Sequence, residues 1–150
     1  MSDDNSAVSD KTEALNDWNT KIIAEFRANA GVVRGPFEGA PVLLLHTIGA
    51  KTGRGRVNPM MYLLQDDRIY VFASKAGADT NPDWFHNLVA NAMVSVELGA
   101  ETFEATAVPL TGADRDRIYA EQAKRNPGFA EYEAKTSRTI PVVELLRSIS

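Results

Sequence analysis

Two very short turns divide the middle of the chain into pairs of strands, and they restrict the fold more than any other feature of the sequence. Two-residue turns join neighbouring antiparallel strands, and glycine at the first turn position is typical of a type II′ hairpin. The two pairs are residues 57–65 and 68–73 around Asp66-Asp67, and residues 93–98 and 101–108 around Gly99-Ala100. In the strand at residues 101–108, Phe103 and Ala105 alternate with Thr102 and Glu104, which indicates one buried and one solvent-facing side.

Two further strands and three helices complete the expected fold. Residues 42–47 form a continuous apolar run, typical of a strand buried on both faces, and residues 140–146 are expected to form a last strand. The helices are expected at residues 10–31, at 82–90 with Asn81 as N-cap and Pro82 first, and at 111–125 opened by Thr111. This order predicts an α+β protein, mainly β: a small antiparallel barrel with peripheral helices rather than a doubly wound sheet.

The first predicted helix carries an apolar stripe that needs a partner. Leu15, Trp18, Ile22 and Phe26 recur at helical spacing, and we expect them to dock on the barrel. Membrane contact is the less favoured alternative, because the helix is short and lacks a cationic rim. No stretch has the length of a transmembrane segment or a signal peptide, so a cytoplasmic protein is expected, with residues 1–9 as a disordered tail and 10–150 as a single domain.

Composition excludes several kinds of chemistry. The 150 residues include no cysteine, which rules out disulfides, thiolate catalysis and sulfur-bound zinc, and fits a reducing compartment. The formal net charge of −4 argues against nucleic acid as a partner. His46 and His86 lack partners at metal-ligand spacing, so no metal site is predicted. Neither histidine has the serine and acid context that acyl transfer needs, and the oligomeric state stays open.

The segment from Gly49 to Arg56 is the strongest candidate for ligand binding. It combines three glycines with Lys51, Arg54 and Arg56 between two predicted strands. Glycines let backbone N–H groups turn towards an anion, and the three cations supply charge-assisted hydrogen bonds. The spacing matches neither a Walker loop nor a dinucleotide fingerprint, and a solvated basic loop explains it equally well on spacing alone.

A second polar segment runs from Ser74 to Trp84, from the end of a strand to the start of a helix. Free amides at a helix start favour an anion or a carbonyl oxygen. Trp84 could form the wall of an aromatic site, although a core position is the commoner role. Phe129 and Tyr132, three residues apart, share a helical face and would either cover a pocket or pack in the core.

Together these segments resemble the deazaflavin (F420)-dependent nitroreductase family, the split β-barrel reductases of actinobacteria. The resemblance covers roughly residues 41–143 and rests on five motifs in a fixed order. The motifs are Gly49-x-Lys51-Thr52-Gly53, Arg56-Val57-Asn58-Pro59, Ala73-Ser74-Lys75-x-Gly77, Asn81-Pro82-x-Trp84 and Arg138-Thr139-Ile140-Pro141. Each motif alone is weak, and the five in order are specific.

The resemblance implies a split β-barrel that holds coenzyme F420 in a groove. Lys51 and Arg56 would then bind the anionic tail, while the strand after Arg56 and the Ser74 loop would surround the deazaflavin ring. The residues implied to bind the coenzyme are Lys51, Thr52, Arg54, Arg56, Asn58, Pro59, Met60, Met61, Ala73, Ser74, Lys75, Ala76, Gly77, Asn81, Pro82 and Trp84.

The chain departs from the family pattern mainly on the acceptor side. Met61, Asn126 and Phe129 stand where a well-studied family member has tyrosines, and only Tyr132 is kept. Ala50 also replaces a family arginine. Met61, Phe129 and Tyr132 are the predicted acceptor contacts, and their apolar character favours a quinone over a nitro compound or an enone.

The implied reaction is hydride transfer from reduced F420 to a small organic acceptor. Ser74 and the amides of Lys75 to Gly77 would stabilise charge on the acceptor, and Tyr132 would orient it or relay a proton, so Ser74 and Tyr132 are the predicted catalytic residues. Two alternatives stay open: an FMN enzyme with the same barrel, and a non-catalytic carrier of an apolar or anionic ligand.

Overall fold

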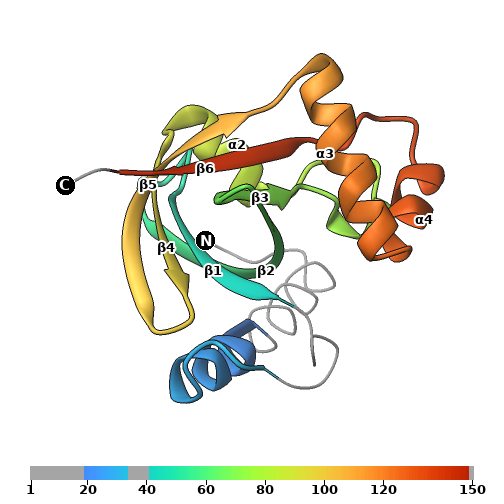
Figure 1. Cartoon of the computed structure of the whole chain (residues 1–150). Coiled ribbons are helices and arrows are strands. Elements are labelled where there is room, and N and C mark those ends of the chain that lie inside the picture. Colours follow the sequence, from blue (N-terminus) through green and yellow to red (C-terminus); the bar gives the residue numbers. More distant parts are fainter. Residues whose placement is uncertain (1–18, 34–40, 149–150) are drawn as a thin grey trace, which may run out of the picture.

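Six antiparallel strands form a closed barrel in a computed structural model that describes residues 19–33 and 41–148 (Figure 1). Around the barrel the strands follow the order β1-β2-β3-β6-β5-β4. Their bounds are β1 Val42–Ile48, β2 Gly55–Gln65, β3 Arg68–Phe72, β4 Met93–Leu98, β5 Glu101–Pro109 and β6 Val142–Arg147. The mainly-β antiparallel barrel predicted from the hairpins is therefore confirmed. The predicted tail at residues 1–9 lies outside the described residues.

Both predicted two-residue turns are present, and their backbone angles explain their sequences. Asp66 and Asp67 both have positive φ, 54° and 65°, and aspartate tolerates this region better than most residues. Gly99 has φ 61° at the turn between β4 and β5. The helical residues 19–28 end in a turn that packs on this hairpin, since a β-carbon on Gly31 would lie 2.7 Å from the α-carbon of Gly99.

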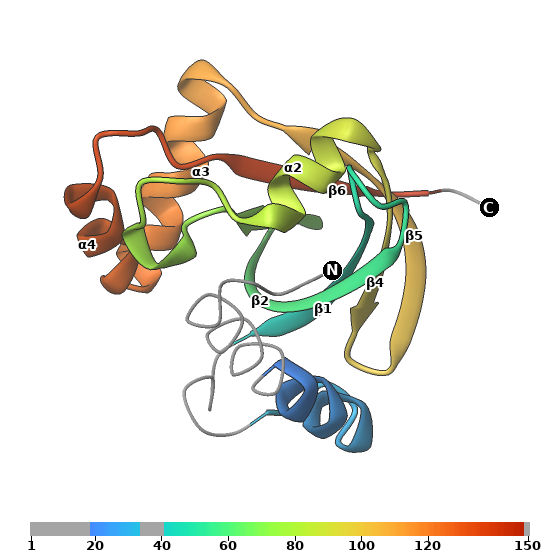
Figure 2. The ribbon, with the colours of Figure 1, turned by 180° about the vertical axis from the view of Figure 1, so that it is seen from behind.

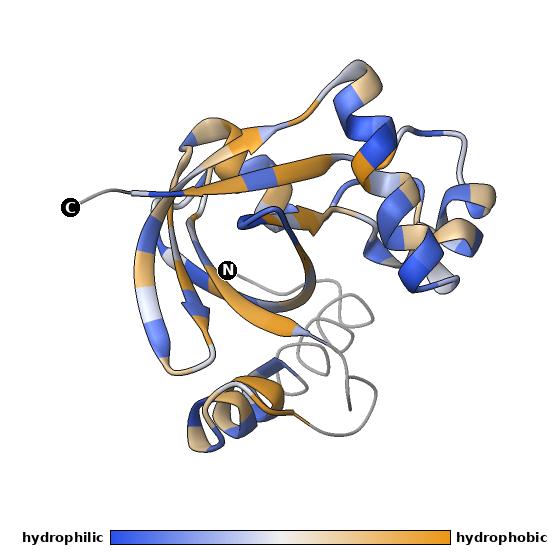
Figure 3. Ribbon diagram, viewed as in Figure 1, coloured by the Kyte–Doolittle hydropathy of each residue, from blue (hydrophilic) through white to orange (hydrophobic). Residues whose placement is uncertain are grey.

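The barrel interior is an apolar core built from alternate residues of the strands. Leu43 and Leu45 of β1 are fully buried there and meet Val71, Val96 and Val143 of other strands. Helix α2, Asp83–Ala90, contributes two large apolar side chains, Trp84 and Leu88, to the same core. The outer sides of the strands carry two smaller apolar clusters, which the other helices cover (Figures 2 and 3).

Helical residues 19–28 dock on the outer side of β1, as the apolar stripe predicts for its described part. Ile22 and Phe26 are buried against Val42 and Leu44, whereas Leu15, Trp18 and the helix start lie outside the described residues. Arg27 also binds the Glu97 carboxylate of β4 through two hydrogen bonds of 3.0 and 2.7 Å. The Arg27 hydrogen bond is the main reason why the pKa of Glu97 is lowered. No helix in the described part of the chain has the length and apolar content to cross a membrane.

Helices α3, Gly112–Arg125, and α4, Gly128–Lys135, form a pair beside β3 and β6 (Figure 1). Phe72 of β3 meets the rings of Tyr119 and Phe129 edge to face, at 5.9 and 5.5 Å between ring centroids. The sequence predicted α3 correctly and left α4 only as a segment with helical spacing. Thr111 caps α3 by position, but its side chain makes no capping hydrogen bond.

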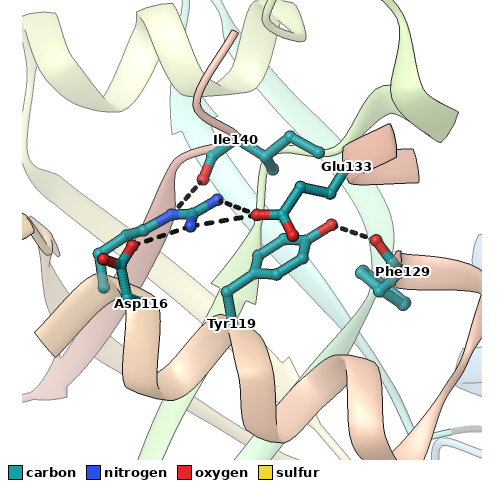
Figure 4. Close-up of polar contacts among 6 residues, drawn as sticks. Asp116, Tyr119, Phe129, Glu133 and Ile140 are labelled. Carbon is teal, nitrogen blue, oxygen red and sulfur yellow. Dashed lines mark hydrogen bonds and ion pairs between the residues drawn. The ribbon is translucent and has the colours of Figure 1, made fainter. Parts of the chain in front are cut away.

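The buried Arg115 guanidinium fastens this helix pair to the chain before β6 (Figure 4). Its Nε donates to the Ile140 carbonyl oxygen at 3.0 Å, and its Nη1 and Nη2 each lie 3.3 Å from the Glu133 carboxylate of α4. The Tyr119 hydroxyl donates to the Phe129 carbonyl oxygen at 2.6 Å. Burial, reinforced by the Glu133 carboxylate, raises the pKa of Tyr119 to about 12, so its hydroxyl stays protonated and keeps this bond at neutral pH.

Candidate functional site

The Gly49–Arg56 segment is an ordered loop at the ends of β1 and β2, and a buried asparagine of α2 holds it. The Asn87 side chain is only 7% exposed. Its Oδ1 accepts the Ala50 N–H at 2.9 Å, and its Nδ2 donates to Thr47 Oγ1 at 3.2 Å. The Asn87 carboxamide therefore links the start of the loop to Thr47, near the end of β1. Sequence reasoning missed Asn87, because an asparagine inside a helix gives no local signal of its partner.

The loop amides are mostly occupied within the protein, which corrects one expectation. Gly49 N–H donates to the Arg54 carbonyl oxygen at 2.7 Å and Gly53 N–H to the Gly49 carbonyl oxygen at 2.9 Å. Arg54 N–H bonds Thr52 Oγ1 at 3.2 Å. With the Ala50 amide held by Asn87, these groups shape the loop instead of facing an anion. The side chains are therefore the main candidates for binding an anion at this loop.

The loop cations are well suited to that role. Lys51, Arg54 and Arg56 are all exposed, and none of their side chains forms a hydrogen bond or ion pair with another residue in the described ranges. Most other arginines there have acidic or carbonyl partners, as Arg27, Arg115 and Arg138 do. A hollow of about 380 Å³ adjoins the loop and is lined in part by Thr47, Ile48 and Gly55. Three unpaired cations on an anchored loop form a local positive site on an acidic protein.

Strand β2 leads from these cations towards the acceptor side, but its residues face two directions. Met60 is 8% exposed and lies in the barrel core, whereas Met61 packs against the two outer clusters. Successive strand residues point to opposite faces, so Asn58 and Met60 share one side and Pro59 and Met61 the other. The predicted run 58–61 therefore does not form one continuous wall of side chains.

The loop after β3 is fastened by an arginine that enters from the other end of the sequence. Arg138 Nη2 donates to the Ser74 carbonyl oxygen at 2.9 Å, and Nε donates to that of Ala78 at 2.7 Å. Its Nη1 donates to Asn81 Oδ1 at 2.8 Å. Asn81 therefore does not cap α2 as predicted, because its side chain accepts from Arg138; Pro82 occupies the cap position without a side-chain bond.

Helix α4 packs directly on this loop and brings Tyr132 to it (Figures 1 and 2). The loop contains a short 3-10 turn, Lys75–Gly77, in which Gly77 has φ +83°. A β-carbon on Gly77 would lie 3.0 Å from the Tyr132 carbonyl oxygen, so only glycine fits between the turn and α4. The structure thus places two predicted catalytic residues, Ser74 and Tyr132, on segments that touch.

Several donors of this loop have no partner among the described residues, and others are already bonded. Gly77 N–H donates to the Ser74 carbonyl oxygen at 2.9 Å, so it is not available as predicted. The amides of Lys75 and Ala76 make no backbone hydrogen bond with described residues, and the hydroxyls of Ser74 and Tyr132 have no partner there. The Lys75 ammonium group already binds Thr80 Oγ1 at 3.1 Å.

Four predicted site residues lie in the apolar cores, and Met60 is one of them. Trp84 is 9% exposed within the barrel core, and Phe129 is 6% exposed among Phe72 and Tyr119. Ala73 is likewise fully buried. These residues therefore pack in the cores, which is the commoner role expected for Trp84 and Phe129 from the sequence.

A pocket of about 330 Å³ opens between β2 and α3, at the Met61 end of β2. Met61, Leu63 and Leu64 form its apolar part, and Gln122 and Asn126 line it from α3 and the residue after it. Asn126 Nδ2 lies 3.8 Å from the Met61 sulfur, a weak acceptor. Gln122 was not predicted as a site residue. Its place near the end of an amphipathic helix is the only sequence signal that it faces inward.

Comparison with known proteins assigns the chain to one family. Residues 18–147 match the family described as F420H(2)-dependent quinone reductase. An F420H(2)-dependent quinone reductase of Mycobacterium tuberculosis is 38% identical over 128 residues, which cover 83% of this chain and 86% of that protein. A solved F420-H2 dependent reductase is 36% identical with a TM-score of 0.64, covering 70% of this chain and 93% of the other. Another solved chain, described as a domain-swapped dimer, is 33% identical with a TM-score of 0.66, over 90% of this chain and 98% of the other.

Proposed function

The chain belongs to the F420H(2)-dependent quinone reductase family, and we propose that its reaction is hydride transfer from reduced F420 to a quinone held at the Met61 end of β2. It is an oxidoreductase that uses coenzyme F420. The finer points proposed here are the residues that carry the reaction and the range of acceptors. We expect nitro compounds and enones to be reduced more slowly than quinones, because Met61 and the neighbouring leucines offer mainly apolar contacts.

The residues present fit an anionic coenzyme. The side chains of Lys51, Arg54 and Arg56 have no partner among the described residues and stand on a loop that Asn87 anchors. This is the observation that carries the proposal, because unpaired cations grouped on an ordered loop bind an anionic tail without first breaking internal ion pairs. Arg56 and Met61 are five residues apart on β2, which corresponds to roughly 17 Å along a strand. Because five is an odd number, the two side chains point to opposite faces, so this spacing measures only the distance along β2 between the charged region and the apolar region.

The protein's own groups supply placement and polar stabilisation. When bound, reduced F420 supplies a hydride from the ring carbon that replaces a flavin nitrogen. An acceptor oxygen gains negative charge on reduction, and the Ser74 hydroxyl with the Lys75 and Ala76 amides are the donors proposed to stabilise it. Arg138 keeps these donors in place through the Ser74 and Ala78 carbonyl oxygens. Tyr132 is proposed to orient the acceptor or to deliver the proton that completes reduction.

The Tyr132→Phe variant is expected to lower turnover several-fold and to leave coenzyme affinity unchanged. The substitution removes one hydroxyl that has no partner among the described residues, and it keeps the ring that lies 5.3 Å from Phe129. Steady-state kcat with menadione and the F420 dissociation constant are the two measurements. Weakened F420 binding with unchanged kcat would place Tyr132 beside the coenzyme instead.

The function itself is tested by mixing the protein with reduced F420 and a series of acceptors in a stopped-flow instrument. Menadione should oxidise the coenzyme faster than a nitroaromatic compound or an enone of similar size. In a parallel titration followed by fluorescence quenching, FMN should bind more weakly than F420 and cause less quenching. Tight FMN binding would favour the flavin alternative, and F420 binding without oxidation by any acceptor would favour a carrier.

A further inference from the structure

We propose that Gln122 is a specificity-determining residue, whose carboxamide hydrogen-bonds a carbonyl oxygen of the quinone in the pocket between β2 and α3. Neither the family match nor the sequence motifs point to this residue. The identity of the ligand as the electron acceptor rests on the proposed function. The binding chemistry itself rests on the pocket.

Gln122 is a buried polar group with unused hydrogen-bonding capacity. Its side chain is 3% exposed, and the carboxamide makes no hydrogen bond with any residue in the described ranges. In the described ranges the one fully buried side-chain atom without a partner is Gln65 Oε1, so the unpaired Gln122 amide is not sealed off and reaches the open space of the pocket. Gln122 lines a pocket of about 330 Å³, so a bound ligand is the partner that the fold leaves room for.

Among the neighbouring polar groups of the pocket, the hydroxyl of half-buried Tyr62 has no hydrogen-bond partner in the described ranges, and two others are engaged or weakly placed. Arg125 Nε binds the Glu121 carboxylate at 2.7 Å. Asn126 Nδ2 faces the Met61 sulfur at 3.8 Å. Of these polar groups Gln122 is the most deeply buried, so a hydrogen bond from a ligand would stabilise it most.

The remaining walls select the body of that ligand. Met61, Leu63 and Leu64 present thioether and aliphatic carbon to the pocket, which suits a flat ring system without charge. A ring with carbonyl oxygens satisfies both the apolar walls and the amide. Arg125 is the one charged residue of the lining, and its guanidinium is half exposed and bound to Glu121, so the buried part of the pocket offers a charged ligand no partner.

A carboxamide also suits both redox forms of a quinone. Reduction to the hydroquinone adds a hydride and a proton in total, and it turns a carbonyl acceptor into a hydroxyl donor. Gln122 Nε2 donates to the carbonyl oxygen before reduction, and Oε1 can accept the hydroxyl hydrogen afterwards. An ionised glutamate at this place could accept from the hydroquinone but could not donate to the quinone.

The test compares two ligands with the same carbon skeleton, of which one carries carbonyl oxygens and the other does not. Menadione and 2-methylnaphthalene share a methylated two-ring carbon skeleton, and only menadione carries carbonyl groups. Binding of each is measured by isothermal titration to coenzyme-free protein, for the natural chain and for Gln122→Leu. We expect Gln122→Leu to weaken menadione binding about tenfold and to leave 2-methylnaphthalene binding equal or tighter.

A second variant, Gln122→Met, repeats the test with a different side-chain shape, and thermal unfolding confirms that each variant is folded. The proposal is overturned if menadione binds both folded variants as tightly as the natural chain, or if both ligands lose affinity equally. The F420 dissociation constant is measured on the same samples. If menadione recognition depends on Gln122 while F420 does not bind, the carboxamide inference stands and the proposed reductase function fails.

Discussion

Replacing Lys51 and Arg56 together with alanine is expected to weaken F420 binding about thirtyfold or more. Each side chain would contribute a charge-assisted contact worth about 1–3 kcal/mol, and the two contributions should add if both meet the same tail. The loop should keep its shape, because its backbone is held by Asn87 and by its own hydrogen bonds rather than by the cations. Fluorescence titration of F420 measures the change.

Lys124→Ala is the matched control for this result. Lys124 is an exposed cation of α3 and lies two residues after Gln122, which puts it on the opposite side of that helix from the pocket. F420 binding to this variant should be unchanged. Raising the salt concentration should weaken coenzyme binding to the natural chain far more than to the double variant, because salt screens exposed charges. Equal affinities of the double variant and the natural chain would refute the role of the loop.

Arg115→Met is expected to lower the free energy of unfolding by about 2–4 kcal/mol. The substitution removes the donor to the buried Ile140 carbonyl oxygen, and an unsatisfied buried acceptor costs about 1–3 kcal/mol. The bond to Glu133 adds less, about 1 kcal/mol or below, because that carboxylate is half exposed. Methionine keeps much of the apolar volume over the Tyr119 ring, so the loss reports on polar contacts. Urea unfolding followed by circular dichroism provides the measurement.

Arg117→Met on the same helix provides the comparison. Arg117 is exposed, and its nearest acidic partner, Asp114, is 3.9 Å away, so its replacement should change stability by about 0.5 kcal/mol or less. Since α4 carries Tyr132 and depends on Arg115 for its position, we also expect Arg115→Met to slow menadione reduction. A loss of 2–4 kcal/mol in both variants would mean that general helix propensity, not the buried network, sets the effect.

The parts of the fold that the sequence predicts well are those with local causes. The turns at Asp66-Asp67 and Gly99-Ala100 need only their own backbone angles, so their sequences identify them. Helix α4 is different. It is short, begins at Gly128 and is held by Phe129 packing on Phe72 and Tyr119. Those partners are distant in sequence, and no single-chain pattern places them together.

The site shows the same division. The glycine and cation pattern of Gly49–Arg56 is local and was recognisable without a structure. The supports of the site are not, since Asn87 reaches the loop across 37 residues and Arg138 reaches Ser74 across 64. The predicted Asn81 cap was wrong for this reason, because a residue with good capping chemistry is used by a distant arginine. Asparagine, glutamine and arginine roles of this kind depend on tertiary contacts.

Strand β2 carries the cationic residue Arg56 near one end and the apolar pocket residue Met61 farther along. The distance between the two proposed binding regions is therefore set by a count of residues in a hydrogen-bonded strand, not by a flexible hinge. Inserting or deleting one residue between them would turn every following side chain to the opposite face and exchange Met60 with Met61. The register of β2 therefore fixes this distance. Substitutions in α3 and α4 can change the preferred acceptor without disturbing that register, whereas insertions or deletions in β2 cannot.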